Sequence, residues 1–284
     1  MSSATPADLV ITPRNPTFGR KETPAHWWYG GKVAPTAFYN ALSLTFPAGE
    51  SFFIRSVRHY RDEMAEPLKS QIDDFIAQEA VHSREHIHFN RQMADNGYDL
   101  SAFQKEFEKR MSETRGRPPL LNLTATMAFE HFTGILAHVW LRHGRYFQGV
   151  PEETRRLWQW HAMEEIEHKA VAYDTFLAVT KDMPGWKRWA LRAKVMLTIT
   201  PRFLQGRIAN MKQMFQQDGV DSFATWTGVW SYLLVYPGLL RQVLPLWLMY
   251  FKPGFHPWQH DDRDLLAAAA AQLGDSASSE RAAA

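Results

Sequence analysis

The feature that most constrains this chain is a pair of Glu-x-x-His motifs, each preceded by a further glutamate in an upstream apolar segment. The six residues of this pattern are Glu50, Glu79, His82, Glu130, Glu165 and His168. Residues three apart share a helix face, so each motif presents a carboxylate and an imidazole together. One glutamate from each of two helices and a Glu-x-x-His from each of two others make a two-metal ligand set in a four-helix bundle. The pattern therefore predicts a helical core built around two metal ions.

Turn signals divide the chain into two helical hairpins. The turn at 66–67 lies close to midway between Glu50 and Glu79. The loop at 144–150 lies near the midpoint of the second glutamate pair. Antiparallel helices folded there would bring the glutamates of each hairpin to the same height, and a crossover at 97–118 joins the hairpins. The fold prediction is all-α: a ferritin-like four-helix bundle with additional C-terminal helices.

Composition changes along the chain predict four segments. They are an extended N-terminal arm at 1–33, a di-metal four-helix bundle at 34–182, apolar C-terminal helices packed on the bundle at 183–260, and a flexible tail at 261–284. Residues 226–251 are strongly apolar, but Pro237, Arg241 and Pro245 interrupt them. Burial against the bundle or in a homodimer interface is therefore favoured over contact with a membrane surface, and a true membrane span is least favoured.

The composition excludes several classes of protein and site. The chain has no cysteine, so any metal must be held by His, Asp and Glu. The net charge is +2 without a concentrated basic face, which argues against a nucleic-acid partner. The N-terminus lacks a secretory signal pattern. We expect a cytoplasmic location, peripheral to the membrane if the apolar stretch contacts one, and a small-molecule substrate.

Helical phase separates the predicted ligands from neighbouring acidic residues. A rival Glu-x-x-His, formed by Glu85 and His88, points away from the face that carries Glu79. Glu165 is preferred to Glu164 because only Glu165 lies three residues before His168.

The ligand types also indicate the metals. Four buried glutamates balance the charge of two divalent cations, and neutral imidazoles add donors without changing that balance. Oxygen-rich ligands with some imidazole favour Fe, with Mn or Zn as alternatives. His86 and His161 share faces with predicted ligands. Each is a candidate for an additional ligand or for a hydrogen-bond partner that orients one.

Several segments resemble a known family. Residues 46–62, 75–90 and 160–174, with 255–258 near the C-terminus, resemble the bacterial family called "predicted metal-dependent hydrolases". The resemblance extends over about 35–260 and implies a ferritin-like di-metal carboxylate protein. The spacing His161-x-x-x-Glu165-x-x-His168 is also similar to the last ligand helix of the di-iron arylamine N-oxygenases. That local resemblance implies that His161 is a further metal ligand.

Three functions are compatible with this ligand set. We expect a di-iron oxidoreductase that activates O₂ to oxidise an organic, lipid-like substrate and takes electrons from a donor protein or cofactor. The first alternative is a metal-dependent hydrolase, in which a metal lowers the pKa of bound water and presents hydroxide to an ester or amide. The second alternative is a metal-handling protein of ferritin type.

Overall fold

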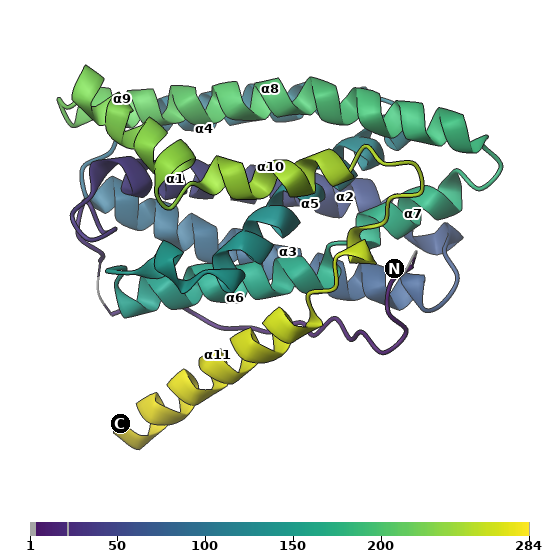
Figure 1. Ribbon diagram of the computed structural model, residues 1–284, viewed down its shortest axis with the longest axis horizontal. Coiled ribbons are helices and arrows are strands. Elements are labelled where there is room, and N and C mark those ends of the chain that lie inside the picture. The colour runs from purple at the N-terminus through teal and green to yellow at the C-terminus, as the bar shows by residue number, and fades with distance from the viewer. Residues whose placement is uncertain (1–3, 22, 284) are drawn as a thin grey trace.

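All regular secondary structure in residues 4–21 and 23–283, the part of the chain that the computed structural model describes, is helical (Figure 1). The helices that surround the predicted ligands are α2 (Phe46–Arg58), α3 (Leu68–Asp95), α5 (Pro119–Arg142) and α6 (Glu152–His168). Helix α2 packs on α3 and on α5, while α6 packs on α5 and on α3. The all-α prediction is confirmed, and the ferritin-like classification stays a prediction.

The first and last helices of this group are shorter than the sequence suggests. A separate helix α1 (Val33–Ser43) precedes α2. The break between them allows Pro47 to occupy the first turn of α2, where its missing N–H costs nothing. Helix α6 ends at His168, and the chain continues as α7 (Val171–Val179). The last ligand therefore stands at the C-terminal end of its helix.

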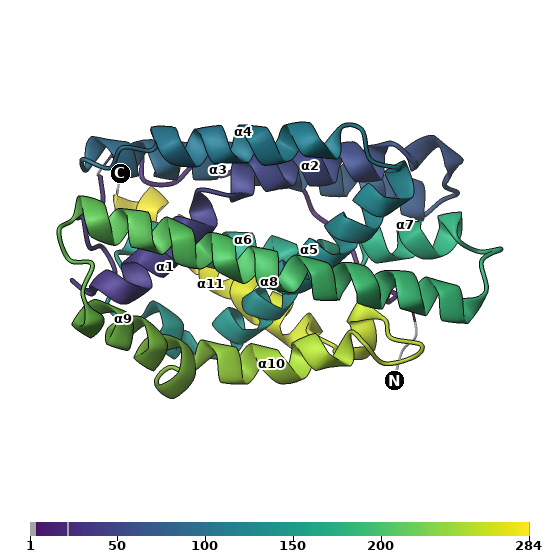
Figure 2. The same ribbon diagram turned by 90° about the horizontal axis from the view of Figure 1, so that it is seen from above.

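Further helices cover this core. They are α4 (Ser101–Thr114) in the crossover, and α8 (Gly185–Gln217), α9 (Phe223–Trp230) and α10 (Leu239–Met249) after it. Helix α8 runs the length of the molecule and packs against α1 and α5 (Figure 2). Helix α9 packs against α1, and α10 packs against α5. The apolar C-terminal stretch thus lies against the helical core along one side.

The membrane prediction concerns α9, α10 and the π-helical turn between them. Within the described residues, no single helix has both the length and the apolar character to cross a membrane. Only the bent pair Phe223–Val235 and Leu239–Met249 meets those criteria together. Several large side chains on the pair are exposed, among them Val235, Leu244 and Leu248. Contact with a membrane surface stays a prediction.

The two ends of the chain behave differently. The N-terminal arm has no regular structure at 4–21 and 23–32, and it buries Ile11 and Phe18 against the core. Where the sequence predicts a flexible tail, the chain forms helix α11 (Arg263–Ala283), which begins packed against α6 and then extends away from the body (Figure 1). The alanine-rich run at 267–271 explains the helix, because alanine has the highest helix propensity.

Candidate metal centre

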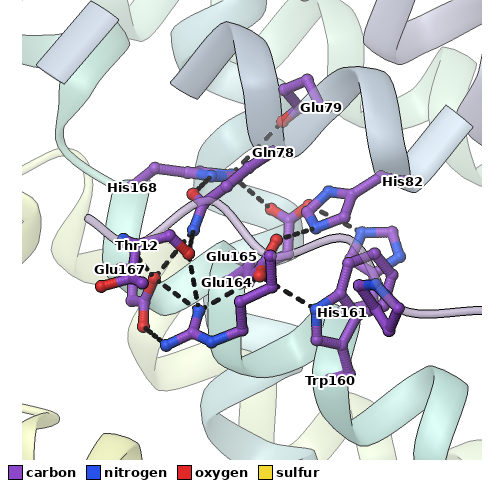
Figure 3. Close-up of polar contacts among 12 residues, drawn as sticks. Thr12, Gln78, Glu79, His82, Trp160, His161, Glu164, Glu165, Glu167 and His168 are labelled. Atoms are coloured by element: carbon purple, nitrogen blue, oxygen red, sulfur yellow. Dashed lines mark hydrogen bonds and ion pairs between the residues drawn. The ribbon is translucent and has the colours of Figure 1, made fainter. Parts of the chain in front are cut away.

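The structure brings the six residues of the sequence pattern into one buried site, of which Figure 3 shows Glu79, His82, Glu165 and His168. Helix α2 supplies Glu50, α3 supplies Glu79 and His82, α5 supplies Glu130, and α6 supplies Glu165 and His168. Every one of these side chains is at most 4% exposed. Four carboxylates in so dry an environment require compensating positive charge.

His168 is the centre of the first cluster. Its Nε2 atom lies 3.3 Å from Glu79 Oε1, 3.4 Å from Glu130 Oε2 and 3.5 Å from Glu165 Oε2. One imidazole nitrogen can donate a single hydrogen bond, and Nε2 has no such partner among the described residues. Three carboxylates around one unbonded nitrogen form the arrangement that a shared cation would stabilise.

His161 belongs to a second cluster. Ligand atoms of Glu50, His82 and His161 lie within 4.8 Å of one another. His161 Nε2 is 2.7 Å from Glu165 Oε1, and His82 Nδ1 is 3.7 Å from the same oxygen. Glu165 therefore directs one oxygen to each cluster and joins the two into a single centre.

Unbonded polar atoms show whether this centre fits metal ions. The buried ligand atoms without a hydrogen-bond partner among the described residues are Glu50 Oε1, both oxygens of Glu79 and of Glu130, Glu165 Oε2, His82 Nδ1 and His168 Nε2. Buried polar groups normally have partners, so such a concentration is exceptional. Oxygen and imidazole donors of this kind suit divalent cations such as Fe, Mn or Zn. The residues present fit a two-metal site.

The electrostatics agree with this fit. Burial, reinforced by the other carboxylates, raises the pKa values of Glu79 and Glu130 well above their ordinary range. Burial likewise raises the pKa of Glu50, although a hydrogen bond from Ser83 opposes the effect. For Glu165, burial is outweighed by the imidazoles of His161 and His168, which hold its pKa well below the usual value. Without cations, the centre would favour protonated carboxyls.

Two side chains to which the sequence pattern assigns no orienting role, Gln78 and Glu164, orient the candidate histidine ligands. Gln78 Oε1 lies 2.9 Å from His168 Nδ1, and accepting a hydrogen bond there leaves Nε2 free to face the carboxylates. Glu164 Oε2 lies 3.1 Å from His82 Nε2 and thereby directs Nδ1 inward. The two side chains thus determine which nitrogen of each histidine faces the centre.

Arg14, from the N-terminal arm, connects these two orienting groups. Its guanidinium donates to Glu164 at 3.1 Å and to Glu167 at 2.8 Å. Glu167 in turn accepts a hydrogen bond of 2.7 Å from the Gln78 amide. A segment without helical period therefore completes the hydrogen bonding behind both Glu-x-x-His motifs, which is why helical spacing alone does not reveal it.

His86 lies behind the second cluster rather than beside its open donors. Its Nε2 is 2.6 Å from His161 Nδ1, and its Nδ1 is 2.9 Å from the hydroxyl of Ser43. Because both ring nitrogens are occupied, His86 is placed to orient His161. Between the two roles that the sequence leaves open for His86, this geometry favours the orienting one.

The rival motif lies outside the centre. Glu85 pairs with Arg20 at 2.6 Å and with Arg84 at 2.8 Å, and it also accepts a hydrogen bond from the Phe18 amide. His88 lies 3.1 Å from the carbonyl oxygen of Gly19. This pair therefore fastens the N-terminal arm to α3.

A small pocket of about 40 Å³ reaches the centre at Glu130. Lys169, His138 and Asp262 line its polar side. Lys169 Nζ lies 2.6 Å from Asp262 Oδ2, and His138 Nδ1 lies 2.7 Å from Asp262 Oδ1. A volume of this size holds a few water molecules, so the pocket offers water a way to Glu130.

A helical core around buried, paired Glu-x-x-His motifs defines a carboxylate- and histidine-based metal protein. Residues 12–261 match the family described as predicted metal-dependent hydrolases, and the chain belongs to that family. The resemblance drawn from the sequence is thereby confirmed. No curated protein and no solved structure matches the chain.

The family assignment corrects the functional expectation. The preference for a di-iron oxidoreductase that activates O₂ is wrong, because the matched family is one of hydrolases. That preference followed the bundle template and the local resemblance around His161, but a donor set of carboxylates and imidazoles is equally compatible with hydrolysis. The metal-dependent character of the family and the two buried clusters support metal ions as cofactors.

Proposed function

We propose that the chain is a hydrolase whose catalytic centre is the metal site joined by Glu165. The observation that carries this proposal is the convergence of buried, unbonded carboxylate and imidazole atoms from Glu79, Glu130 and His168. Membership of the hydrolase family supports the same reaction class. The substrate would be a small molecule with an ester or amide bond.

The proposed ligands fall into two sets around Glu165. Glu79, Glu130 and His168 would hold one ion, and Glu50, His82 and His161 would hold the other. A bound divalent cation supplies Lewis-acid chemistry, which lowers the pKa of water and polarises a carbonyl. Fe, Mn and Zn all fit the donor set, so the metal is to be identified by measurement.

The protein's own side chains keep the imidazole donors unprotonated, fix the orientation of their rings and exclude bulk water from the site. Burial lowers the pKa of His82 well below its ordinary value, so its ring stays unprotonated and able to bind a cation. Gln78 and Glu164 fix the ring orientations. The Phe75 ring, 4.8 Å from that of His168, and Trp160, 4.9 Å from that of His82, exclude bulk water from one side.

A reconstitution assay tests the proposal. The full-length protein is stripped with a chelator, reloaded with Fe, Mn or Zn, and offered a panel of esters, amides and phosphate esters. We expect hydrolysis of at least one class that requires metal and disappears in the Glu79→Gln variant. Hydrolysis that survives chelation, or fully loaded protein that hydrolyses no member of the panel, would overturn it. Mineral loading far beyond two ions per chain would instead support metal storage.

A further inference from the structure

A second, larger pocket lies between α2, α4, α5 and α8, with a volume of about 610 Å³. It is of the size that proteins use for small organic ligands. Its walls are largely apolar, and much of the surface comes from Phe52, Phe107, Phe132, Ile199 and Phe203. Figure 2 shows these helices from above, lying across the view.

The inner wall of this pocket adjoins the metal centre. The Phe46 ring lines the pocket and lies 4.9 Å from the His161 ring and 4.7 Å from the His86 ring. Gly49 and Phe129 also line it, and each directly precedes a proposed ligand, Glu50 or Glu130. A molecule held in the pocket would be separated from the centre by single side chains.

Arg207 is an exceptional residue in this lining. It is only 6% exposed, and no carboxylate in the described part of the chain lies within ion-pair distance of it. Its guanidinium donates to the hydroxyl of Thr45 and lies over the Phe203 ring, 5.3 Å from the centroid. Its Nε atom has no hydrogen-bond partner among the described residues. Arginine is almost never buried without a counter-charge.

The other cations that line the pocket are less buried than Arg207, and two of them have carboxylate partners. Arg110 on α4 pairs with Glu106 at 2.8 Å, and Arg117, in the loop after α4, pairs with Glu113 at 3.8 Å. Gly206 has no side chain, which lets Arg110 pack against α8 beside Arg207. Burial, with a smaller contribution from Arg110, lowers the pKa of Arg207 to about 9. Among the described cations that line the pocket, Arg207 is therefore the one that is buried without a carboxylate partner, whereas Lys109 and Arg202 are exposed to solvent.

We infer that this pocket binds a monocarboxylate with an apolar chain, whose carboxylate pairs with Arg207 and whose chain fills the aromatic cavity. The planar guanidinium matches a carboxylate in shape and charge. This inference rests on the proposed function, because the ligand would be the substrate that the hydrolase centre converts or the product that it releases. The substrate class is thus a hydrolysable amphiphile that carries a carboxylate.

Calorimetric titration tests the inference on the full-length protein. The probes are decanoate, decan-1-ol and decyl phosphate, each below its micellar concentration. We expect decanoate to bind at least about tenfold more tightly than the alcohol, as a charge-assisted hydrogen bond would give. The Arg207→Met variant should lose that preference. The Lys212→Met variant, which alters an exposed cation of the same helix outside the pocket, should keep it.

Other results would overturn the inference. Equal binding of decanoate and decan-1-ol would show that Arg207 does not recognise an anion, as would an unchanged preference in Arg207→Met. Tighter binding of decyl phosphate than of decanoate would contradict the carboxylate assignment. Because the titration uses metal-free protein and needs no turnover, binding without hydrolysis would count against the proposed function alone. Hydrolysis without decanoate binding would count against this inference alone.

Discussion

Glu165 Oε2 lies 3.5 Å from His168 Nε2 on one face of α6, and neither atom has a hydrogen-bond partner among the described residues. Two buried polar atoms left unbonded at that distance are costly unless something else compensates them. A cation shared between them, Glu79 and Glu130 would provide the compensation.

The amide of Gln78 should control metal affinity through His168. We expect Gln78→Leu to weaken binding about tenfold or more, because the acceptor that fixes the His168 ring is lost. The measurement is competition against a chelator of known affinity. Gln71→Leu, two turns earlier on α3, is the control and should bind as the wild type does. Equal affinities for wild type and Gln78→Leu would show that the ring needs no such support.

Arg14 should stabilise both the fold and the centre. Arg14→Met leaves the buried carboxylates of Glu164 and Glu167 without their counter-charge. Arg14 is 30% exposed, so solvent screening limits the loss in unfolding free energy to about 1–3 kcal/mol. Urea denaturation measures this loss. Metal affinity should fall as well, whereas the control Arg20→Met, which removes one of the two arginine partners of Glu85, should leave it unchanged. A metal affinity equally reduced in both variants would argue against a specific role for Arg14.

The stability of the metal-free protein should fall as pH rises from 6.5 to 8. The pKa values of Glu50, Glu79 and Glu130 are raised in the fold, so above their ordinary value of 4.5 the folded state binds more protons than the unfolded state. The pKa values of His82 and His86 are lowered in the fold, so these two residues increase the stability of the folded state as pH rises. That increase is complete above their ordinary pKa of 6.5. Denaturation of chelated protein across this range measures the slope.

Metal provides the control for that slope. Bound cations favour the ionised carboxylates, so the metal-loaded protein should show little loss of stability over the same pH range. A chelated protein whose stability stays constant or rises with pH would contradict the assignment of these carboxyls to a buried, uncompensated cluster.

Arg207→Met should stabilise the protein even though it removes a hydrogen bond to Thr45. The wild-type residue keeps a buried positive charge without a carboxylate partner. Replacing such a charge with an apolar side chain of similar length should raise the unfolding free energy by about 1–2 kcal/mol. Thermal and urea denaturation of both proteins measure the change. A destabilised variant would indicate that Arg207 serves the fold rather than a ligand.

The sequence predicts the helical class and the main hairpins because both depend on local signals. Turn residues near 66 and 144 end one helix and begin the next, and the apolar spacing sets the buried faces. Pro47 indicates an interruption of the first helix, and α2 begins beside it at Phe46. The break after His168 is not predicted, since no strong helix-ending signal stands there. For the C-terminal segment, composition alone does not distinguish a frayed alanine-rich helix from a flexible tail.

The residues of the centre are predicted for the same reason: helical phase relates Glu79 to His82 and Glu165 to His168. The orienting groups Gln78, Glu164 and Arg14 are not predicted in those roles, because the roles depend on contacts between residues far apart in the chain. Arg14 contacts Glu164 from the N-terminal arm, 150 residues earlier in the chain, and Gln78 contacts His168 from another helix. Arg207 is missed as well, since its lack of a partner is a property of the folded pocket.

The most direct test of the account is the metal content of Glu165→Gln. Elemental analysis of full-length protein, purified from its own host and freed of loosely bound ions, should give about two metal ions per chain for the wild type. Glu165 faces both clusters, so its loss should reduce the content below one ion per chain. The Glu85→Ala control should retain the wild-type content. Two ions per chain in Glu165→Gln would contradict the central claim that this glutamate joins the two clusters into one metal centre.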